Sequence, residues 1–256
     1  MSRLARLEIK LNCQEALSYQ MSSLFHGVLM EYIPCEYVSF LHQSRLHPYA
    51  QHLEYREQKW YWVINALTQD AAETIFNTIL LETDSINIQK RGLTIPVESR
   101  NLYEYSYEKL AGQFYHTESD RYVQLHFITP TAFKQQGRYV FYPDIRCIYQ
   151  SLMNKYDSAV SDECLYDEET LNELCANSEI KHYDLKSTRF HLEGVRIPSF
   201  IGKITVRLRG TQTMANFANL LFQFGTYSGI GIKTALGMGA IRIMKKRGKE
   251  CDREAD

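Results

Sequence analysis

The sequence lacks the cysteine spacing of a disulfide framework or a structural zinc site. Its six cysteines, at positions 13, 35, 147, 164, 175 and 251, include no C-x-x-C pair, which favours a reducing compartment. No apolar run approaches the length of a membrane-spanning helix. The N-terminus MSRLARLEIKLNC alternates apolar and polar residues, which is typical of a strand and not of a signal peptide. We therefore expect a cytoplasmic protein that does not enter a membrane.

Patterns that bind metals or nucleotides are also missing. There is no H-x-x-x-H pair and no D-x-D cluster, and the acidic stretch SDECLYDEETLNEL lacks the central glycine of a calcium loop. The glycine-rich segment YSGIGIKTALGMGAIRI, residues 227–243, has Ile232 where a P-loop needs glycine before Lys233. It has Thr234 where the third glycine of a dinucleotide fingerprint belongs, and too little chain follows for a βαβ unit. We expect no metal and no cofactor.

The charge is unevenly distributed, although the net charge is only −1. Residues 157–184 contain nine acidic residues and one basic residue, Lys181. Residues 194–249 contain ten basic residues and no acidic one. A solvated basic face would be the ordinary explanation, but 56 residues without a carboxylate favour a site for a polyanion. We interpret the acidic stretch as a solvated insertion with a short helix that faces away from this partner.

Periodicity predicts two halves of similar pattern. The first half is expected to contain a strand at Arg3–Leu11, helices at Leu17–Ile33 and Cys35–Leu41, a polar stretch at 42–57, a strand at Trp60–Leu67, a helix from Asp70 to about Leu81 capped by Thr68, and a strand at Ile86–Ile88. The second is expected to contain strands at Tyr122–Ile128, Ser187–Val195, Ile201–Arg209 and Ala240–Met244, and helices at Asp144–Tyr156, Glu168–Ala176 and Met214–Phe224. The predicted fold class is α+β, with two tandem ferredoxin-like β-α-β-β-α-β domains at 1–118 and 119–256.

One predicted strand, Ile201–Arg209, has two chemically different faces. Its apolar members alternate with Lys203, Arg207 and Arg209. Residues on one face of a strand lie about 7 Å apart, close to the phosphate spacing of an extended nucleic acid. An ordinary solvated antiparallel face would also alternate. Because no anion lies among the three cations, we favour binding to a nucleic-acid backbone.

Several segments together resemble the CRISPR-associated repeat-processing endoribonucleases of the RAMP superfamily. They are FHGVLMEY, FLHQSRLHPYAQ, FITPTAF, GRYVFYPDIRCIYQSLMNKY, HLEGVRIPSFIGKITVRLRG and FGTYSGIGIKTALGMGAIRI, in this order along nearly the whole chain. The resemblance implies tandem ferredoxin-like domains and metal-independent cleavage of CRISPR repeat RNA in the precursor transcript. In that reaction the ribose 2′-hydroxyl attacks the adjacent phosphorus, leaving a 2′,3′-cyclic phosphate and a 5′-hydroxyl. Whether the protein forms a homodimer or hands its product to a CRISPR effector complex stays open.

The candidate catalytic residues follow from the chemistry and the resemblance together. Cleavage needs a base, an acid and a stabiliser of the charge on the phosphorane, and histidine suits the first two roles. His42 occupies the family's Leu-His position, and His47 or Arg45 could complete the site. A histidine that only stabilises a helix end remains the alternative for His42. Met30 stands where some members of the family carry a tyrosine, which Tyr32 or Tyr37 could replace.

The resemblance also assigns RNA binding to the glycine-rich segment. Glycines permit positive φ angles and close approach of a backbone, so the expected contacts are Gly229, Gly231, Lys233, Thr234, Gly237 and Gly239. Packing of the loop against the sheet is the competing explanation. The missing tyrosine leaves open a non-catalytic RNA-binding subunit of an effector complex. A ferredoxin-like module for another anion is the third alternative.

Overall fold

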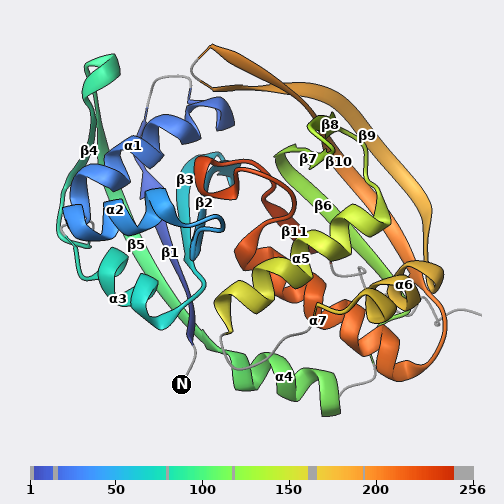
Figure 1. Ribbon diagram of the computed structural model, residues 1–256. Helices are drawn as coiled ribbons and strands as arrows, with labels where there is room; N and C mark the ends of the chain where they lie inside the picture. Colours follow the sequence, from blue (N-terminus) through green and yellow to red (C-terminus); the bar gives the residue numbers. More distant parts are fainter. Residues whose placement is uncertain are drawn as a thin grey trace, which may run out of the picture.

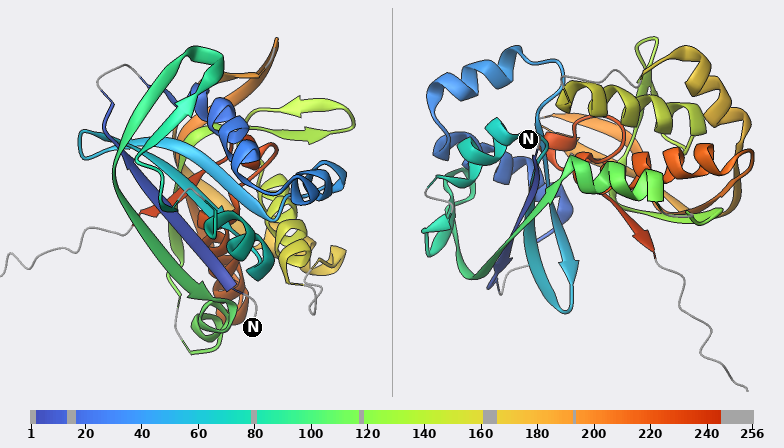
Figure 2. Two further views of the ribbon diagram at one scale, coloured as in Figure 1. Left: turned by 90° about the vertical axis from the view of Figure 1, so that its left-hand side faces the viewer. Right: turned by 90° about the horizontal axis from the view of Figure 1, so that it is seen from below.

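The computed structural model describes residues 3–13, 17–78, 81–116, 119–160, 166–192 and 194–244. Cys164, Cys251, residues 161–165 of the acidic stretch and the basic residues 245–249 lie outside these ranges. Each half of the chain forms a sheet covered on one face by helices, and the two halves lie side by side (Figure 1 and the right panel of Figure 2). Among the helices that are described, none combines the length and the apolar character needed to cross a bilayer.

The first unit has a five-stranded sheet in the order β2-β3-β1-β5-β4. Its elements are β1 (Arg3–Leu11), η1 (Tyr19–Met21), α1 (Ser22–Tyr32), α2 (Cys35–Gln43), β2 (Tyr49–Arg56), β3 (Lys59–Ala66), α3 (Gln69–Phe76), β4 (Ser85–Ile88), η3 (Gln89–Arg91), β5 (Leu93–Ser106) and α4 (Tyr107–His116). Strands β1, β2, β3 and β5 with helices α1 and α3 make the ferredoxin-like pattern, in which the first strand lies between the third and the fourth.

The second unit repeats this arrangement with the sheet order β11-β6-β10-β9. Its elements are β6 (Tyr122–Thr131), β7 (Phe133–Gln135), β8 (Arg138–Val140), α5 (Ile145–Ala159), α6 (Glu168–Ala176), β9 (Ser178–Leu192), β10 (Val195–Leu208), α7 (Gln212–Ser228), η4 (Thr234–Leu236) and β11 (Ile241–Met244). Hairpin β7–β8 and helix α6 are additions to the pattern. The prediction of two tandem ferredoxin-like units is therefore confirmed.

Side-chain caps fix where the helices begin. The predicted cap Thr68 accepts a hydrogen bond from the backbone N–H of Ala71 at 3.1 Å. Asp144 caps α5 in the same way, with 2.7 Å to the N–H of Cys147. These bonds satisfy N–H groups that have no partner within the helix, so the predicted starts of α3 and α5 fall within one residue of the observed ones.

Three predictions about the strands are wrong. The polar stretch 42–57 contains strand β2, whose Gln51 and Glu54 are buried. The strand at Ile86–Ile88 does not close the first sheet, because β4 pairs only with the start of β5 and β5 is the strand that pairs with β1. Strand β9 begins at Ser178 and not at Ser187, so the last part of the acidic stretch is paired with β10.

The two units share side chains across their junction. Ala235, in the glycine-rich segment of the second unit, is buried in the core of the first. Helix α4 precedes the predicted boundary at 118/119, yet its Tyr107 and Leu110 belong to the core of the second unit. The Tyr107 hydroxyl donates a hydrogen bond to the carbonyl of Leu67, 2.8 Å away. Each unit therefore contributes to the interior of the other.

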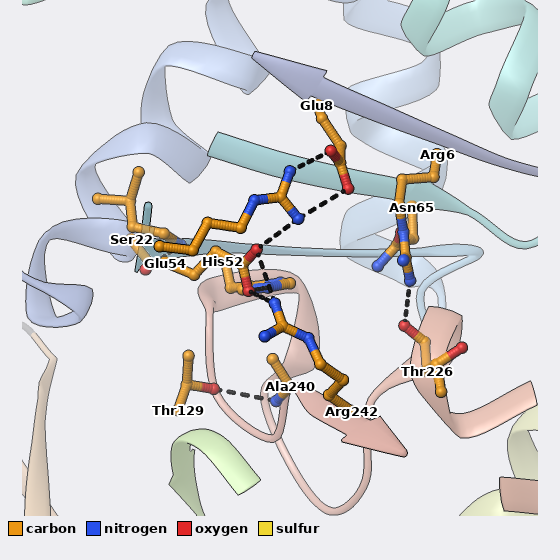
Figure 3. Close-up of polar contacts among 12 residues, drawn as sticks. Arg6, Glu8, Ser22, His52, Glu54, Asn65, Thr129, Thr226, Ala240 and Arg242 are labelled. Atoms are coloured by element: carbon orange, nitrogen blue, oxygen red, sulfur yellow. Dashed lines mark hydrogen bonds and ion pairs between the residues drawn. The ribbon is translucent and has the colours of Figure 1, made fainter. Parts of the chain in front are cut away.

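A buried ionic cluster closes the junction on the face of the first sheet that helices α1 and α3 leave open (Figure 3). The Glu54 carboxylate on β2 accepts hydrogen bonds from Arg242 on β11, at 3.0 and 3.2 Å, and lies 3.0 Å from the Arg56 guanidinium. Burial works to raise the pKa of Glu54. The hydrogen bond from His52 and the charges of His52, Arg242 and Arg56 outweigh it and hold this pKa at about 2. The carboxylate is thus charged and paired across the units.

Candidate active site

Three histidines and a tyrosine come together where α1, α2 and β2 meet. His26 lies on α1, His42 in the last turn of α2, His47 in the loop that follows, and Tyr49 at the start of β2. The Tyr49 ring is almost parallel to the rings of both His26 and His47, with centroids 6.3 and 5.7 Å away. Its hydroxyl lies 2.9 Å from His26 Nδ1. Stacking on Tyr49 therefore fixes the orientation of the His47 ring.

The electrostatics of His26 and His47 favour their neutral forms. Burial lowers the pKa of His26 to about 4, and the charges of His47 and His42 add to the effect. The pKa of His47 is also lowered, first by burial and then by His42. The charge of His42 contributes to both shifts, although His42 is itself exposed to solvent. The group therefore offers one exposed imidazole beside two partly buried ones that resist protonation.

The other predicted catalytic residues lie at different depths. Arg45 is exposed in the loop between His42 and His47. Tyr32 is partly buried and packs on the core of the first unit. It lies six residues after His26 on α1, which turns its side chain about 240° around the helix axis from that histidine. The tyrosine that contacts the histidines is Tyr49, which the sequence did not single out because tyrosine is abundant throughout the chain.

The glycine-rich segment is shaped mainly by contacts within the protein. Gly229, Gly231, Gly237 and Gly239 all have positive φ angles. A Cβ added to Gly237 would overlap Ser22 of α1, and one added to Gly231 would overlap a backbone carbonyl. Gly229, Gly237 and Gly239 are buried. Packing of the loop therefore accounts for these three glycines, while Gly231 remains partly exposed.

A buried amide ties this segment to the first unit. Gln51 Nε2 donates hydrogen bonds to the carbonyls of Ser22 and Ala235, each 2.9 Å away. Its oxygen accepts the indole N–H of Trp62, also at 2.9 Å, which fixes the orientation of the amide. Lys233, just before η4, has φ +56° and an exposed side chain. The anchored loop thus presents Lys233 and Thr234 on the side of the histidines.

A cavity of about 470 Å³ opens between these parts. It is bounded by the α2–β2 loop, hairpin β7–β8, helix α5 and the glycine-rich segment. Its cationic and titratable lining includes Arg45, His47, Lys134, Lys155 and Lys233. Among the described residues, no Asp or Glu side chain lines it. The cavity is therefore a place where an anionic group would meet several cations beside His47.

The predicted cations of β10 lie elsewhere and have acidic neighbours. Lys203 is paired in register with Asp184 of β9, and with His126 on its other side. Because β11 also pairs with His126 through Arg242, these side chains share the sheet face opposite the core. Arg209 lies one residue beyond the end of β10. No anion lies among these cations in their own segment, but β9 places Asp184 and Glu179 beside them, and their binding to RNA stays a prediction.

The other predicted cations, Arg207 and Arg209, also have partners within the protein. Arg207 lies opposite Glu179 in the register, with its guanidinium 5.8 Å from the centroid of the Tyr122 ring. Arg209 forms an ion pair with Glu179 at 2.7 Å. The predicted RNA-binding residues therefore fall into two surfaces, one at the glycine-rich segment and one on the open face of the second sheet. Within the described ranges, no cluster of three metal-ligating side chains is present.

Comparison with known proteins agrees with this geometry. Residues 125–241 match the family model of the CRISPR-associated endoribonuclease Cas6. The chain is 38% identical to a CRISPR-associated endoribonuclease Cas6 of Streptococcus thermophilus over 224 residues, which is 87% of this chain and 91% of that protein. It is 35% identical to a protein of the same name from Mycobacterium tuberculosis (strain CDC 1551 / Oshkosh) over 239 residues, 93% of this chain and 76% of that one.

Solved structures share the fold at lower identity. A Cas6 product complex superposes with a TM-score of 0.79 at 22% identity, covering 95% of this chain and all of the other. The Cas6 of Thermus thermophilus gives a TM-score of 0.72 at 19% identity, covering 95% and 99%.

The fold together with the curated relatives identifies the class of protein as a CRISPR-associated endoribonuclease. The chain belongs to the CRISPR-associated endoribonuclease Cas6 family. The resemblance noted in the sequence, the fold class and the endoribonuclease class are all confirmed.

Proposed function

We propose that this endoribonuclease cleaves CRISPR repeat RNA within the precursor transcript, without a metal ion, through attack of a ribose 2′-hydroxyl on the adjacent phosphorus. The bond to the leaving 5′-oxygen breaks, giving a 2′,3′-cyclic phosphate and a 5′-hydroxyl. The observation that carries this proposal is the convergence of His42, His47 and an acid-free cationic cavity at the junction of the two units. The curated relatives of the chain bear the name CRISPR-associated endoribonuclease.

The environments of the two histidines suggest a division of roles. Burial keeps His47 neutral near pH 7, which suits it to accept the proton of the 2′-hydroxyl. His42 is exposed at the end of α2 and can deliver a proton to the leaving oxygen. Arg45 and Lys233 line the region where charge builds up on the phosphorane and can stabilise it. Tyr49 and His26 act as positioning residues that hold the His47 ring.

The glycine-rich segment supplies backbone contacts to the RNA at its exposed part, Gly231, Lys233 and Thr234. The buried glycines Gly229, Gly237 and Gly239 support these contacts by holding the loop in shape. Lys203, Arg207 and Arg209 form a second and weaker contact surface, because Asp184 and Glu179 lie beside them. Tyr32 contributes to the packing of α1 and not to proton transfer.

The reaction takes place in the cytoplasm, where the transcript is made. Self-association into a homodimer and transient transfer of the product to a CRISPR effector complex belong to the same proposal. Size-exclusion chromatography with and without repeat RNA tests the first, and capture of labelled product by the assembled effector complex tests the second.

The decisive experiment incubates the protein in EDTA with a CRISPR repeat RNA from its own genome. A matched RNA carries 2′-deoxyribose at the scissile nucleotide. We expect cleavage of the first RNA and survival of the second, and loss of cleavage in His42→Ala. Undiminished cleavage in the double variant His42→Ala/His47→Ala would overturn the assignment of the histidines. Tight binding with neither RNA cut would instead indicate a non-catalytic RNA-binding subunit.

A further inference from the structure

Helix α5 contains a buried lysine that has no acidic partner among the residues the structure describes. The Lys155 side chain is almost fully buried, and its ammonium donates hydrogen bonds to the carbonyl oxygens of Gly229 and Ser228, 3.0 and 3.4 Å away. These carbonyls terminate α7 and begin the glycine-rich segment. Burial lowers the pKa of Lys155 to about 7. The charged form is therefore costly in the protein as it stands.

The buried carboxylates among the described residues have partners of opposite charge. Glu54 and Glu8 are each paired with an arginine. The recorded partners of Lys155 are two neutral carbonyls, which occupy two of its three N–H donors. A neutral donor would satisfy these carbonyls equally well. Capping of α7 therefore explains a hydrogen-bond donor at this position but does not explain a charge.

Lys155 lies at the floor of two adjoining cavities. The cavity beside His47 measures about 470 Å³, and a second one of about 550 Å³ extends along α5. Both are lined by Lys155, Arg45 and Lys134, and in the described part of the chain no Asp or Glu side chain lines either of them. Arg45 and Lys134 are exposed at the surface. The titratable groups that face Lys155 from the surrounding elements are Arg45, His47, Lys134, Tyr139, Cys147, Tyr166 and Lys233.

We propose that this pocket binds a phosphate of the RNA backbone next to the cleaved linkage, with Lys155 at its floor and Arg45 and Lys134 at its mouth. The proposal rests on the proposed function, since the phosphate belongs to the substrate RNA. A phosphate supplies a negative charge, which the described residues do not place beside Lys155. It reaches the third N–H donor of the ammonium, while the two carbonyls keep the side chain pointed into the pocket.

The same contact would link substrate binding to the shape of the loop. Lys155 holds the first residues of the glycine-rich segment, and Gly231 of that segment lines both cavities. The Gly231 N–H is fixed by the Ser151 hydroxyl of α5, 2.8 Å away. A phosphate bound on α5 would therefore lie against a loop that α5 already supports.

The test measures the affinity of the full-length protein for the 2′-deoxy repeat RNA, which cannot be cleaved, as a function of salt. We expect Lys155→Met to weaken binding on the order of tenfold at low salt. We also expect it to reduce the slope of log Kd against log salt by about 0.7, the value for one phosphate contact with a single strand. Lys155→Arg, which keeps the charge, should recover part of the slope. The control Lys109→Met removes an exposed lysine on α4 and should change neither quantity.

Arg45→Gln and Lys134→Gln provide a route that does not disturb the interior, because both side chains are exposed. Each should lower the salt slope by a similar amount. Unchanged slopes in all three pocket variants, with the wild-type protein still binding and cleaving the repeat, would overturn the pocket and leave the proposed function intact. Failure of the wild-type protein to bind repeat RNA at all would overturn both.

Discussion

The junction between the two units has two charged regions, and strand β2 connects them. At one end of β2, Glu54 is buried among Arg56, Arg242 and His52, with opposite charges in contact. At the other end, Tyr49 adjoins the histidines and a cavity whose cations face one another without a carboxylate. The first region satisfies its charges with protein groups. The second does not pair them with carboxylates of its lining, and in our proposal they are left for the RNA. This difference separates the part of the junction that holds the units together from the part that we propose acts on RNA.

The largest effect is expected from the unpaired region. His42→Ala should reduce the rate of repeat cleavage by 10²–10⁴-fold, roughly the contribution of a positioned acid or base. The free energy of unfolding should change by less than about 0.5 kcal/mol, because the side chain is exposed. Single-turnover cleavage and urea denaturation measure the two quantities. The neighbouring variant Gln43→Ala serves as the control, and a comparable loss of activity there would contradict a specific role for His42.

In the region around Glu54, where charges are paired, a substitution should instead lower the stability of the protein. Glu54→Ala leaves Arg242 and Arg56 without their shared carboxylate, although Arg56 keeps Glu8, and loss of hydrogen bonds to a charged group costs about 1.5–3 kcal/mol. For a chain of this size that corresponds to a fall in Tm of about 2–4 °C per kcal/mol. Calorimetry measures the shift. If Glu54→Ala were as stable as the wild-type protein, the cluster would not stabilise the junction between the units.

Lys155 should reveal itself in the pH dependence of stability. Its pKa is about 7 in the folded protein but near its ordinary value of about 10.4 in the unfolded chain. Between these values the unfolded chain binds more protons, so the free energy of unfolding rises with pH above 7 and is level below it. Relative to Lys155→Met, the wild-type protein should gain about 1–3 kcal/mol between pH 7 and pH 9. Urea denaturation of both proteins at these pH values measures the gain. If the free energies of unfolding of the two proteins changed with pH in parallel, burial would not lower the pKa of Lys155.

The smallest effect is expected on the open face of the second sheet. Lys203 has Asp184 opposite it on β9, so a phosphate there would compete with a carboxylate. Lys203→Met should weaken binding of the uncleavable repeat by about twofold or less, as for an exposed ion pair worth under 1 kcal/mol. A loss equal to that of Lys155→Met would mean that neighbouring acids do not distinguish the two groups of cations.

The sequence predicted the architecture better than the site. Tandem ferredoxin-like units followed from the order of apolar periodicities, and the caps Thr68 and Asp144 marked helix starts because their bonds are local. Strand β2 was missed because Gln51 and Glu54 are polar residues that become buried only when the second unit supplies Ala235 and Arg242. Such burial depends on contacts about 180 residues apart in the chain, which periodicity does not contain.

The site was predicted in part. His42, His47 and Arg45 lie together as expected, although their catalytic roles stay predictions. Tyr49 could not be singled out, because its role depends on two rings that approach it from different elements. Lys155 did leave a signal in the sequence. It falls on the apolar stripe of α5 with Ile148, Leu152 and Ala159, at spacings of four, three and four residues, where a charged residue is unexpected.

The anchoring of the glycine-rich segment has a consequence for how this protein can be divided. Ala235 is part of the first core, and Gln51 of the first unit binds the backbone on which Ala235 lies. The first half of the chain, expressed alone, would expose the apolar side chains that pack on Ala235. Its Gln51 amide would also have lost one of its acceptors. The two ferredoxin-like units are therefore not interchangeable modules. A chimaera with a relative would have to exchange the glycine-rich segment together with the residues of the first unit that pack on it, although the two are far apart in the sequence.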